Sequence, residues 1–248
     1  MTRIRMAALA LGCAALATVN VAEAGAQQTD VALVYRLLEA REMSVVPASG
    51  TQHLARVGER LRNNDVVSTS ERTRAALRFT DDGSVLRVNP NTRVRILSAA
   101  EGGVVVRTLR LELGELWTRV NRRPGTTLRV QTPAGVAAVK GTEFVVRVDS
   151  LGVTTVLTLE GVVEFFNPSG RVDISAGNKV TVDSASAPRA QPATREELQR
   201  GEGARGDEPG TPAGTWVEVQ MRDANGQTRT LMLRLPADAV RRRLEGRP

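Results

Sequence analysis

The stretch 75-AALRFTDDGSVLRV-88 decides the fold of this chain. Ala75 to Phe79 and Leu86 to Val88 are short runs rich in apolar residues, and the polar segment between them contains Asp82-Gly83. An Asp-Gly pair between two such runs is a strong signal for a β-hairpin, because glycine readily adopts the positive φ that a tight turn requires. The stretch therefore predicts a strand, a turn and a second strand.

Alternation of apolar and polar residues continues on both sides of this hairpin. Val94 and Ile96 alternate with arginines, and the leucines of 109–113 alternate with Arg110 and Glu112 until Gly114, where we expect the strand to end. The pattern predicts roughly nine or ten strands between residues 57 and 183, with turn signals every eight to twelve residues or so. This spacing is typical of an all-β sandwich, barrel or solenoid. Residues 31–42 fit either a helix or a strand.

The C-terminal part of the chain changes in composition. Residues 184–214 are rich in Ser, Ala, Pro, Gly and charge, which predicts a flexible linker. Residues 215–248 contain two alternating runs around Asp223-Ala224-Asn225-Gly226, which predict a β-hairpin, and then a basic tail with Arg241-Arg242-Arg243. Because a lone hairpin is marginally stable, we expect it to pair with an edge of the main domain or with another chain.

The N-terminus has the features of an export signal. Arg3 and Arg5 precede a mostly apolar stretch from Met6 to Val21, and Ala24 and Ala26 each end a small-x-small cleavage site. The apolar stretch is shorter than the roughly 20 residues of a membrane-spanning helix. We therefore expect residues 1–26 to be a cleaved signal peptide, the mature protein to be periplasmic or secreted, and no stable membrane span to remain.

Charge and cysteine content exclude several classes of function. The only cysteine, Cys13, lies in the predicted signal peptide, so the mature chain would contain neither disulfides nor a thiol nucleophile. The formal net charge is +7, but the arginines are scattered among acidic residues and aromatic residues make up only 3% of the chain. A nucleic-acid-binding protein would need clustered cations and stacking aromatic side chains, so we expect no nucleic-acid partner.

The sequence contains no recognisable catalytic or metal-binding set. His53 is the only histidine, it lies in a polar loop, and no Gly-x-Ser-x-Gly motif accompanies it. Asp81 and Asp82 are adjacent carboxylates, but they belong to the hairpin turn described above. We expect no enzyme activity, metal or cofactor. One alternative stays open, a glycan hydrolase using two carboxylates in a cleft.

A series of short blocks resembles the FecR-type domain, the extracytoplasmic part of iron-dicitrate-type transmembrane regulators. The resemblance covers roughly residues 40–183. The blocks, in chain order, are Gly58–Arg62, Asp65–Thr69, Arg74–Phe79, Asp82-Gly83-Ser84, Asn89-Pro90-Asn91-Thr92, Leu113–Trp117, Val130–Pro133, Val139-Lys140-Gly141-Thr142-Glu143-Phe144, Leu159-Glu160-Gly161-Val162-Val163 and Ala176-Gly177.

This resemblance implies an all-β domain of solenoid-like or curled antiparallel sheets, placed by us at residues 27–183, outside the cytoplasm. In such regulators the domain receives a signal from an outer-membrane transporter and passes it to a sigma factor. Here only Met1 to Arg5 would remain inside, so we expect a stand-alone module that binds an envelope protein or a cell-wall component. An accessory regulator in transporter-linked signalling is the alternative.

Most of the positions that match the family blocks are expected to have structural roles. Gly83 and Gly161 suit turns, Gly141 suits a bend, Asn91 suits a turn, and Phe144 suits the core. The carboxylates of Asp82 and Glu143 are the two groups that could either accept hydrogen bonds within the fold or face a ligand, and we expect the former. The exposed strand faces, rich in Arg and Glu, are then the expected contact surface.

Overall fold

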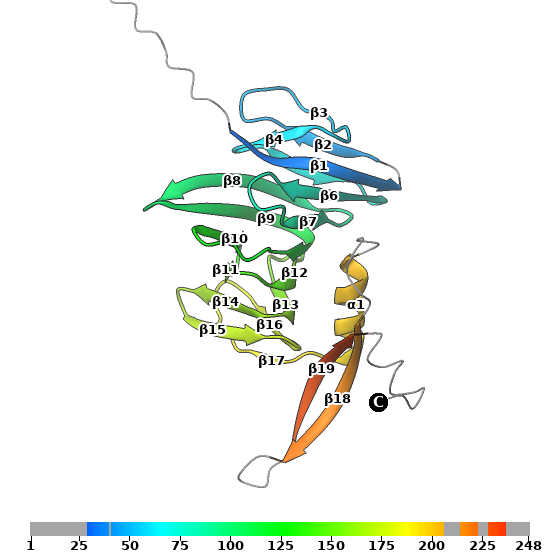
Figure 1. Cartoon of the computed structure of the whole chain (residues 1–248), viewed down its shortest axis with the longest axis vertical. Coiled ribbons are helices and arrows are strands. Elements are labelled where there is room, and N and C mark those ends of the chain that lie inside the picture. The colour runs from blue at the N-terminus through cyan, green and yellow to red at the C-terminus, as the bar shows by residue number, and fades with distance from the viewer. Residues whose placement is uncertain (1–28, 40, 206–213, 223–227, 237–248) are drawn as a thin grey trace, which may run out of the picture.

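The structure, a computed structural model, describes residues 29–39, 41–205, 214–222 and 228–236 (Figure 1). The predicted signal peptide (1–26), the turn at 223–226 and the basic tail at 241–243 lie outside these ranges. Among the described residues, no helix combines the length and the apolar character needed to cross a membrane.

The fold is almost entirely β, as predicted, with a single described helix. Its elements in chain order are β1 (Asp30–Glu39), β2 (Met43–Val46), β3 (His53–Leu54), β4 (Arg60–Arg62), β5 (Val66–Thr69), β6 (Thr73–Phe79), β7 (Val85–Val88), β8 (Arg93–Glu101), β9 (Val104–Arg119), β10 (Thr126–Thr132), β11 (Gly135–Val139), β12 (Glu143–Val148), β13 (Thr154–Glu160), β14 (Val162–Asn167), β15 (Gly170–Ser175), β16 (Asn178–Val182), β17 (Gln191–Pro192), α1 (Arg195–Arg205), β18 (Gly214–Arg222) and β19 (Thr228–Pro236).

Residues 57–183 contain more strands than the sequence pattern indicates. The structure has thirteen there, β4 to β16. The additional ones include β4 and β11, which are short or lack clear alternation of apolar and polar residues. The ambiguous segment at 31–42 forms a strand, β1, up to Glu39.

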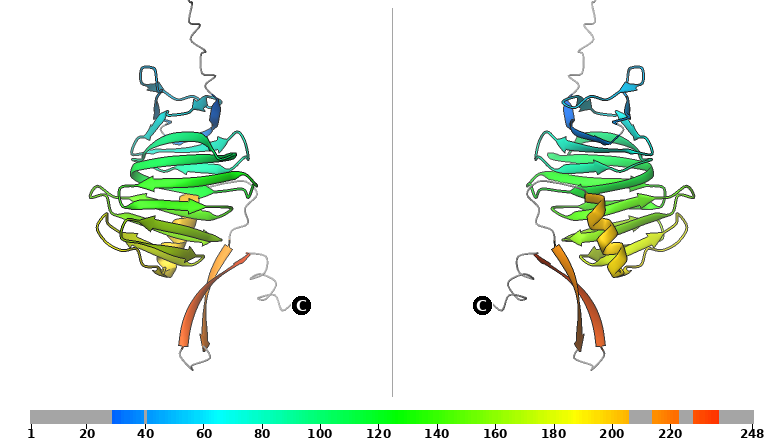
Figure 2. Two further views of the ribbon diagram at one scale, coloured as in Figure 1. Left: turned by 90° about the vertical axis from the view of Figure 1, so that its left-hand side faces the viewer. Right: turned by 90° about the vertical axis from the view of Figure 1, so that its right-hand side faces the viewer.

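The strands stack into two layers that share β9. Sheet A has the order β4-β1-β6-β7-β9-β12-β13-β16-β17, and sheet B has the order β3-β2-β5-β8-β9-β10-β11-β14-β15. The pairings are antiparallel except for β9 with β10, which is parallel and corrects the purely antiparallel expectation. Figure 2 shows the resulting stack from two opposite sides.

The core lies between the two layers. Leu77 and Leu116 of sheet A and Ile96 and Leu109 of sheet B are completely buried in one continuous apolar cluster, which also contains Phe144. Val, Leu and Ala supply most of this cluster, as the low aromatic content requires. Because alternate residues of each strand face inward, the other half of each strand forms an outer face of the stack.

The strand containing 109–113 does not end at Gly114, which contradicts the sequence-based expectation. β9 pairs with β8 and β10 in sheet B, continues through Gly114 (φ +100°), and then pairs with β7 and β12 in sheet A. A Cβ atom at Gly114 would lie 2.5 Å from Thr92 Cα and 2.7 Å from the Asn91 oxygen. Glycine thus allows β9 to cross between the layers against the turn at 89–92.

The predicted flexible linker at 184–214 is wrong for residues 191–192 and 195–205, which form regular structure. Gln191 and Pro192 form β17, which pairs with β16, and α1 follows it. α1 packs on the outer face of sheet A (Figure 2, right). It buries Leu198 completely. Residues 206–213 are outside the described ranges.

The predicted C-terminal hairpin is present as β18 and β19, which pair in register from Gly214–Pro236 to Arg222–Thr228. Within the described part of the chain these two strands form a separate two-stranded sheet. The expected pairing of this hairpin with an edge of the main domain is therefore not seen.

Candidate functional site

Asp82, in the turn of the β6–β7 hairpin, faces a buried arginine. The guanidinium of Arg107, on β9, donates to both carboxylate oxygens of Asp82, and both side chains are 1% exposed. Asp82 Oδ1 also accepts the backbone N–H of Ser84 at 2.8 Å, and Arg107 stacks over the Phe79 ring at 4.3 Å. This carboxylate therefore joins the hairpin of sheet A to β9 in sheet B.

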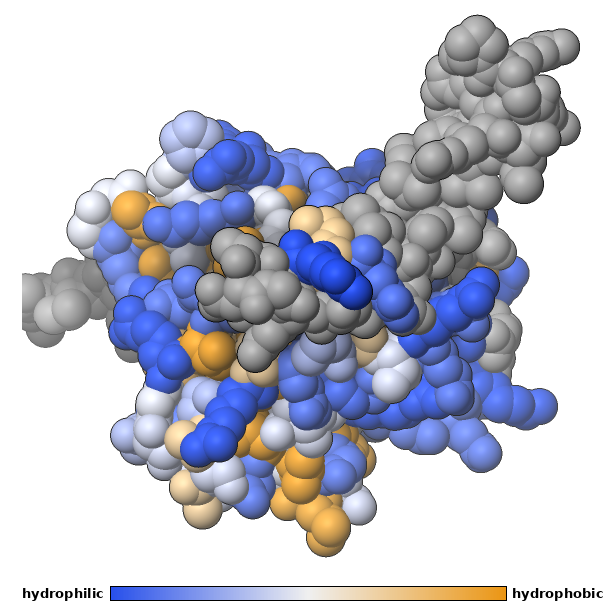
Figure 3. All heavy atoms as spheres, turned by 90° about the horizontal axis from the view of Figure 1, so that it is seen from below, coloured by the Kyte–Doolittle hydropathy of each residue, from blue (hydrophilic) through white to orange (hydrophobic). Residues whose placement is uncertain are grey.

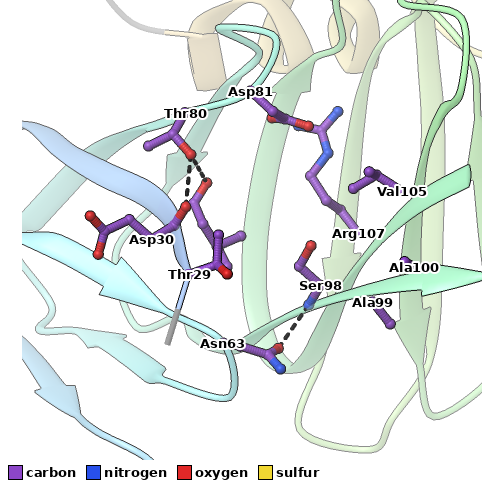
Figure 4. A pocket seen from close by; sticks show the side chains of 11 residues that line it. Thr29, Asp30, Asn63, Thr80, Asp81, Ser98, Ala99, Ala100, Val105 and Arg107 are labelled. Carbon is purple, nitrogen blue, oxygen red and sulfur yellow. Dashed lines mark hydrogen bonds and ion pairs between the residues drawn. The ribbon is translucent and has the colours of Figure 1, made fainter. Parts of the chain in front are cut away.

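A cavity of about 490 Å³ opens beside this ion pair, at the start of β1 (Figure 4). Small residues such as Ser98, Ala99 and Ala100 are part of its lining, and two carboxylates, Asp30 and Asp81, border it. Arginines hold both: Arg60 donates to Asp30 at 2.7 Å, and Arg107 lies 3.6 Å from Asp81. A glycosidase uses two carboxyl groups that are free to face a substrate in a cleft, whereas arginines of the fold already engage both carboxylates here. We therefore do not pursue the hydrolase alternative.

Glu143, the first residue of β12, is also buried, and it accepts hydrogen bonds from a neutral donor and from a charged donor. Its side chain is 1% exposed, and it accepts Trp117 Nε1 at 3.2 Å and Arg119 Nη2 at 2.8 Å from the neighbouring β9. Nη1 of Arg205, at the end of α1, lies 3.9 Å from Glu143 Oε1, the oxygen that accepts Trp117 Nε1. Glu143 thus lies on the outer face of sheet A, beneath the C-terminal end of α1.

The remaining family-motif positions lie at turns and corners of the stack. Thr92 accepts the Glu115 N–H at 2.9 Å, and the Ser84 hydroxyl accepts the Asn121 N–H at 2.9 Å. Phe144 lies in the core. The other positions lie where the chain passes from one sheet to the other or leaves a strand: Gly83, Asn91, Gly141, Thr142, Glu160 and Gly161.

The outer face of sheet A carries an apolar area that α1 covers. We call this area the α1 seat; it consists of Trp117, Val145, Leu157 and Leu159, with Val85 at its margin. From α1 itself the buried residues are Leu198, Gly201, Ala204 and Arg205.

Few interactions favour α1 on its seat. Burial of Leu198 contributes about 2 kcal/mol, whereas Gly201 and Gly203 each cost about 1 kcal/mol relative to alanine in a helix. A helix of this length is marginal by itself, so α1 depends on its contacts with the sheet.

Polar contacts fix the N-terminal end of α1. Thr194 and Glu197 form a capping box, with Glu197 N to Thr194 Oγ1 at 3.2 Å and Thr194 N to Glu197 Oε2 at 2.9 Å. Lys179 of β16 forms an ion pair with Glu197. Partial burial raises the pKa of Glu197, but the hydrogen bonds from Lys179 and Thr194 outweigh it, so that the pKa lies below its ordinary value.

The outer face of sheet B carries no helix in the described part of the chain (Figure 2, left). On this face Arg95 of β8 lies directly opposite Arg110 of β9. Both arginines have neutral amides as hydrogen-bond partners: Arg95 donates to Asn64 Oδ1 at 2.9 Å, and Arg110 donates to Gln131 Oε1 at 3.3 Å. Like charges directly opposite in a sheet destabilise the pair, so this position favours an anionic group.

Other arginines on the same face have carboxylate partners from the chain itself. The exposed pairs are Arg93–Glu112 at 2.8 Å, Arg129–Glu101 at 3.3 Å and Arg171–Glu164 at 2.8 Å. Arg95 and Arg110 consequently stand out as the cations available to a partner.

The end of the stack at β15 and β17 offers a less distinct surface. Polar and charged side chains cover most of the described surface visible from this end, and apolar side chains gather in small groups (Figure 3). The two outer faces of the sheets are therefore the stronger candidates.

His53 lies at the opposite end, on β3, and makes a local contact. Its Nε2 is 2.7 Å from Glu59 Oε1. The Glu59 hydrogen bond and the bond to the Thr51 carbonyl raise the pKa of His53 above its ordinary value. Among the described residues, no group of three or more His, Cys, Asp or Glu side chains is arranged to hold a metal ion.

Replacement of Glu59 by glutamine is expected to lower the pKa of His53, because its largest source of stabilisation is removed. The pKa of His53 is higher in the folded protein than in the unfolded chain. The contact therefore stabilises the fold fully at a pH below the unfolded pKa of about 6.5, and this stabilisation is lost as the pH rises through the folded pKa. An NMR titration of this single histidine checks the shift. Identical titration curves for the wild-type protein and the Glu59→Gln variant would show that the contact is absent.

Comparison with known proteins gives a structural and a family match. Two crystal structures of a candidate anti-sigma factor from Parabacteroides distasonis ATCC 8503 are similar, with 19% and 20% identity and TM-scores of 0.47 and 0.46. Each alignment covers 54% of this chain and 62% of the other, so the chain spans less than two thirds of those structures. None of the curated proteins matches the chain. The protein family described as "FecR protein" matches residues 65–164.

Proposed function

We propose that this protein is an exported, non-enzymatic binding module of a regulatory signalling system, because residues 65–164 match the FecR protein family. Its partner would be a protein whose acidic segment lies on the outer face of sheet B. The proposal includes export because residues 1–26 have the basic start, the apolar stretch and the small-x-small ends of a signal peptide.

A single observation carries the choice of face, the directly opposed pair Arg95 and Arg110. A carboxylate placed between them would relieve their repulsion and accept a charge-assisted hydrogen bond from each guanidinium. The rest of this face is already neutralised by its own ion pairs, so binding there would gain little from further acidic groups.

The FecR domain also supports a partner that takes part in signal transfer. An accessory regulator would contact either a transporter or a membrane regulator through such a protein–protein surface. A cell-wall component is the other class of partner considered, and the experiment below separates the two.

The double variant Arg95→Gln/Arg110→Gln is expected to bind its envelope partner at least about tenfold more weakly than the wild-type protein, which corresponds to about 1.4 kcal/mol. Residues 27–248 would be immobilised and incubated with envelope extract at low and high salt, and bound proteins would be identified by mass spectrometry. Binding of purified peptidoglycan would be measured in parallel.

The matched control is Arg129→Gln, because Arg129 lies on the same face but is paired with Glu101. It should retain the partner. Equal loss in the double variant and the control, or a partner that is insensitive to all three substitutions, would contradict the proposed face. Binding to peptidoglycan alone would replace the protein partner with a cell-wall ligand.

A further inference from the structure

The α1 seat has the size and chemistry of a helix-binding surface. Trp117 is completely buried beneath α1, and Val145, Leu157 and Leu159 extend the apolar area across β12 and β13. Without α1, these side chains would form a contiguous apolar area on the outer face of sheet A. Such areas on a soluble domain are characteristic of sites that bind another chain.

α1 fills this surface incompletely. Leu198 is the only large apolar side chain that it buries there. Gly201 occupies the contact position one turn later, and because it has no side chain, the helix backbone packs directly against Leu157. A cavity of about 140 Å³ remains alongside; Val145, Leu157 and Gly201 border it together with two threonines and five charged residues, Glu115, Arg147, Lys179, Glu197 and Arg200. A helix with larger side chains on one edge of its contact face would bury more of the surface.

Charges at the two ends of the seat define the orientation of a bound helix. Lys179 lies at the end where α1 begins, and it pairs with Glu197 in the first turn. Glu143 lies at the other end, within 3.9 Å of Arg205. A helix with an acidic first turn and a basic last turn therefore matches both the seat and its own dipole.

We infer that α1 is a displaceable cover, and that the α1 seat is a docking site for an amphipathic helix of a protein partner. The recognised helix carries a glutamate in its first turn, a large apolar residue next to it, a small residue one turn later and an arginine at its end. Because Leu198 is the only large apolar side chain that α1 buries on the seat, a partner helix with one more buried apolar side chain can replace α1. This site lies on the opposite face from the one assigned above, and it does not depend on that assignment.

A labelled peptide of residues 191–206 with Gly203→Ala would serve as the probe in place of the partner helix. Gly203 is a suitable position because no atom lies near the Cβ that alanine would add. The Leu198→Asp variant of residues 27–248 releases its own α1, so we expect it to bind the peptide at least tenfold more tightly than the wild-type protein. The control is Gln199→Asp, which adds the same charge on the exposed side of α1, and we expect it to bind as the wild-type protein does.

A reversible staple provides a second measurement in case Leu198→Asp disturbs the fold. The Cβ position of Gly201 lies 3.7 Å from Val145 Cγ2 and 2.7 Å from Leu157 Cδ2, so cysteines at positions 145 and 201 can be joined once the end of the Leu157 side chain rotates away. The oxidised Val145→Cys/Gly201→Cys protein should bind the peptide at least tenfold more weakly than the same protein after reduction. Equal affinity in the two redox states, or in Leu198→Asp and Gln199→Asp, would overturn the inference.

Discussion

Replacement of Asp82 by asparagine is expected to destabilise the protein by about 3–5 kcal/mol, because it leaves the buried charge of Arg107 without its main counter-charge. Both side chains are 1% exposed, so bulk water screens the charge of Arg107 only weakly. Asparagine keeps the shape of the side chain and an oxygen that can accept the Ser84 N–H. The substitution therefore removes mainly the negative charge. Urea denaturation followed by circular dichroism measures the free energy of unfolding.

The control for Asp82→Asn is Glu101→Gln. Glu101 also pairs with an arginine, Arg129, but the two side chains are 55% and 41% exposed. An exposed pair contributes at most about 1 kcal/mol, so this variant should remain close to the wild-type protein. If the free energy of unfolding fell by the same small amount in both variants, the Asp82–Arg107 pair would contribute no more to stability than an exposed ion pair.

Substitution of Gly114 by alanine is expected to lower the free energy of unfolding by about 3–5 kcal/mol, in the range that only large structural conflicts reach. The positive φ of +100° disfavours any residue with a Cβ. In addition, the new Cβ would lie 2.5 Å from Thr92 Cα, a backbone atom that cannot rotate away. Either β9 or the turn at 89–92 must then move.

Gly58→Ala separates the two contributions to this loss. Gly58 has a similar φ of +90°, but no heavy atom lies within 4 Å of its Cβ position. We expect a cost of about 1–2 kcal/mol, from backbone conformation alone. Equal effects of Gly58→Ala and Gly114→Ala in urea denaturation would show that the packing of β9 against Thr92 does not constrain the fold.

Local features of the sequence predicted most of the strands. The Asp82-Gly83 turn and the alternation around it predicted the hairpin of β6 and β7, and the same reasoning predicted β18 and β19. These predictions succeeded because turn geometry and side-chain alternation depend on neighbouring residues. The path of β9 through Gly114 could not be predicted this way, since it depends on packing against Thr92, which is remote in sequence.

α1 was missed because its sequence resembles a linker. It has two glycines, many charges and a single large apolar residue, Leu198. Its helical character depends on the apolar surface of sheet A, which sequence composition does not reveal. The Thr194-x-x-Glu197 capping box was a usable signal, and it indicated where the helix begins.

The carboxylates of the candidate sites were identified, but their partners were not. Asp82 and Glu143 were expected to accept hydrogen bonds within the fold, and their arginines, Arg107 and Arg119, lie 25 and 24 residues away along the chain. The opposition of Arg95 and Arg110 likewise depends on the register between β8 and β9. Because the chain has so many arginines, only the strand register shows which of them lie next to a carboxylate and which lie opposite another arginine.

The position of β9 in both layers has a mechanical consequence. Among the described strands, every backbone pairing between those that precede β9 and those that follow it passes through β9 itself. A pulling force along the stack is therefore carried by two joints on the N-terminal side, β7–β9 and β8–β9. The first has four paired positions and the second has nine. Under such a load sheet A would separate first, between β7 and β9, while sheet B still held the two halves together.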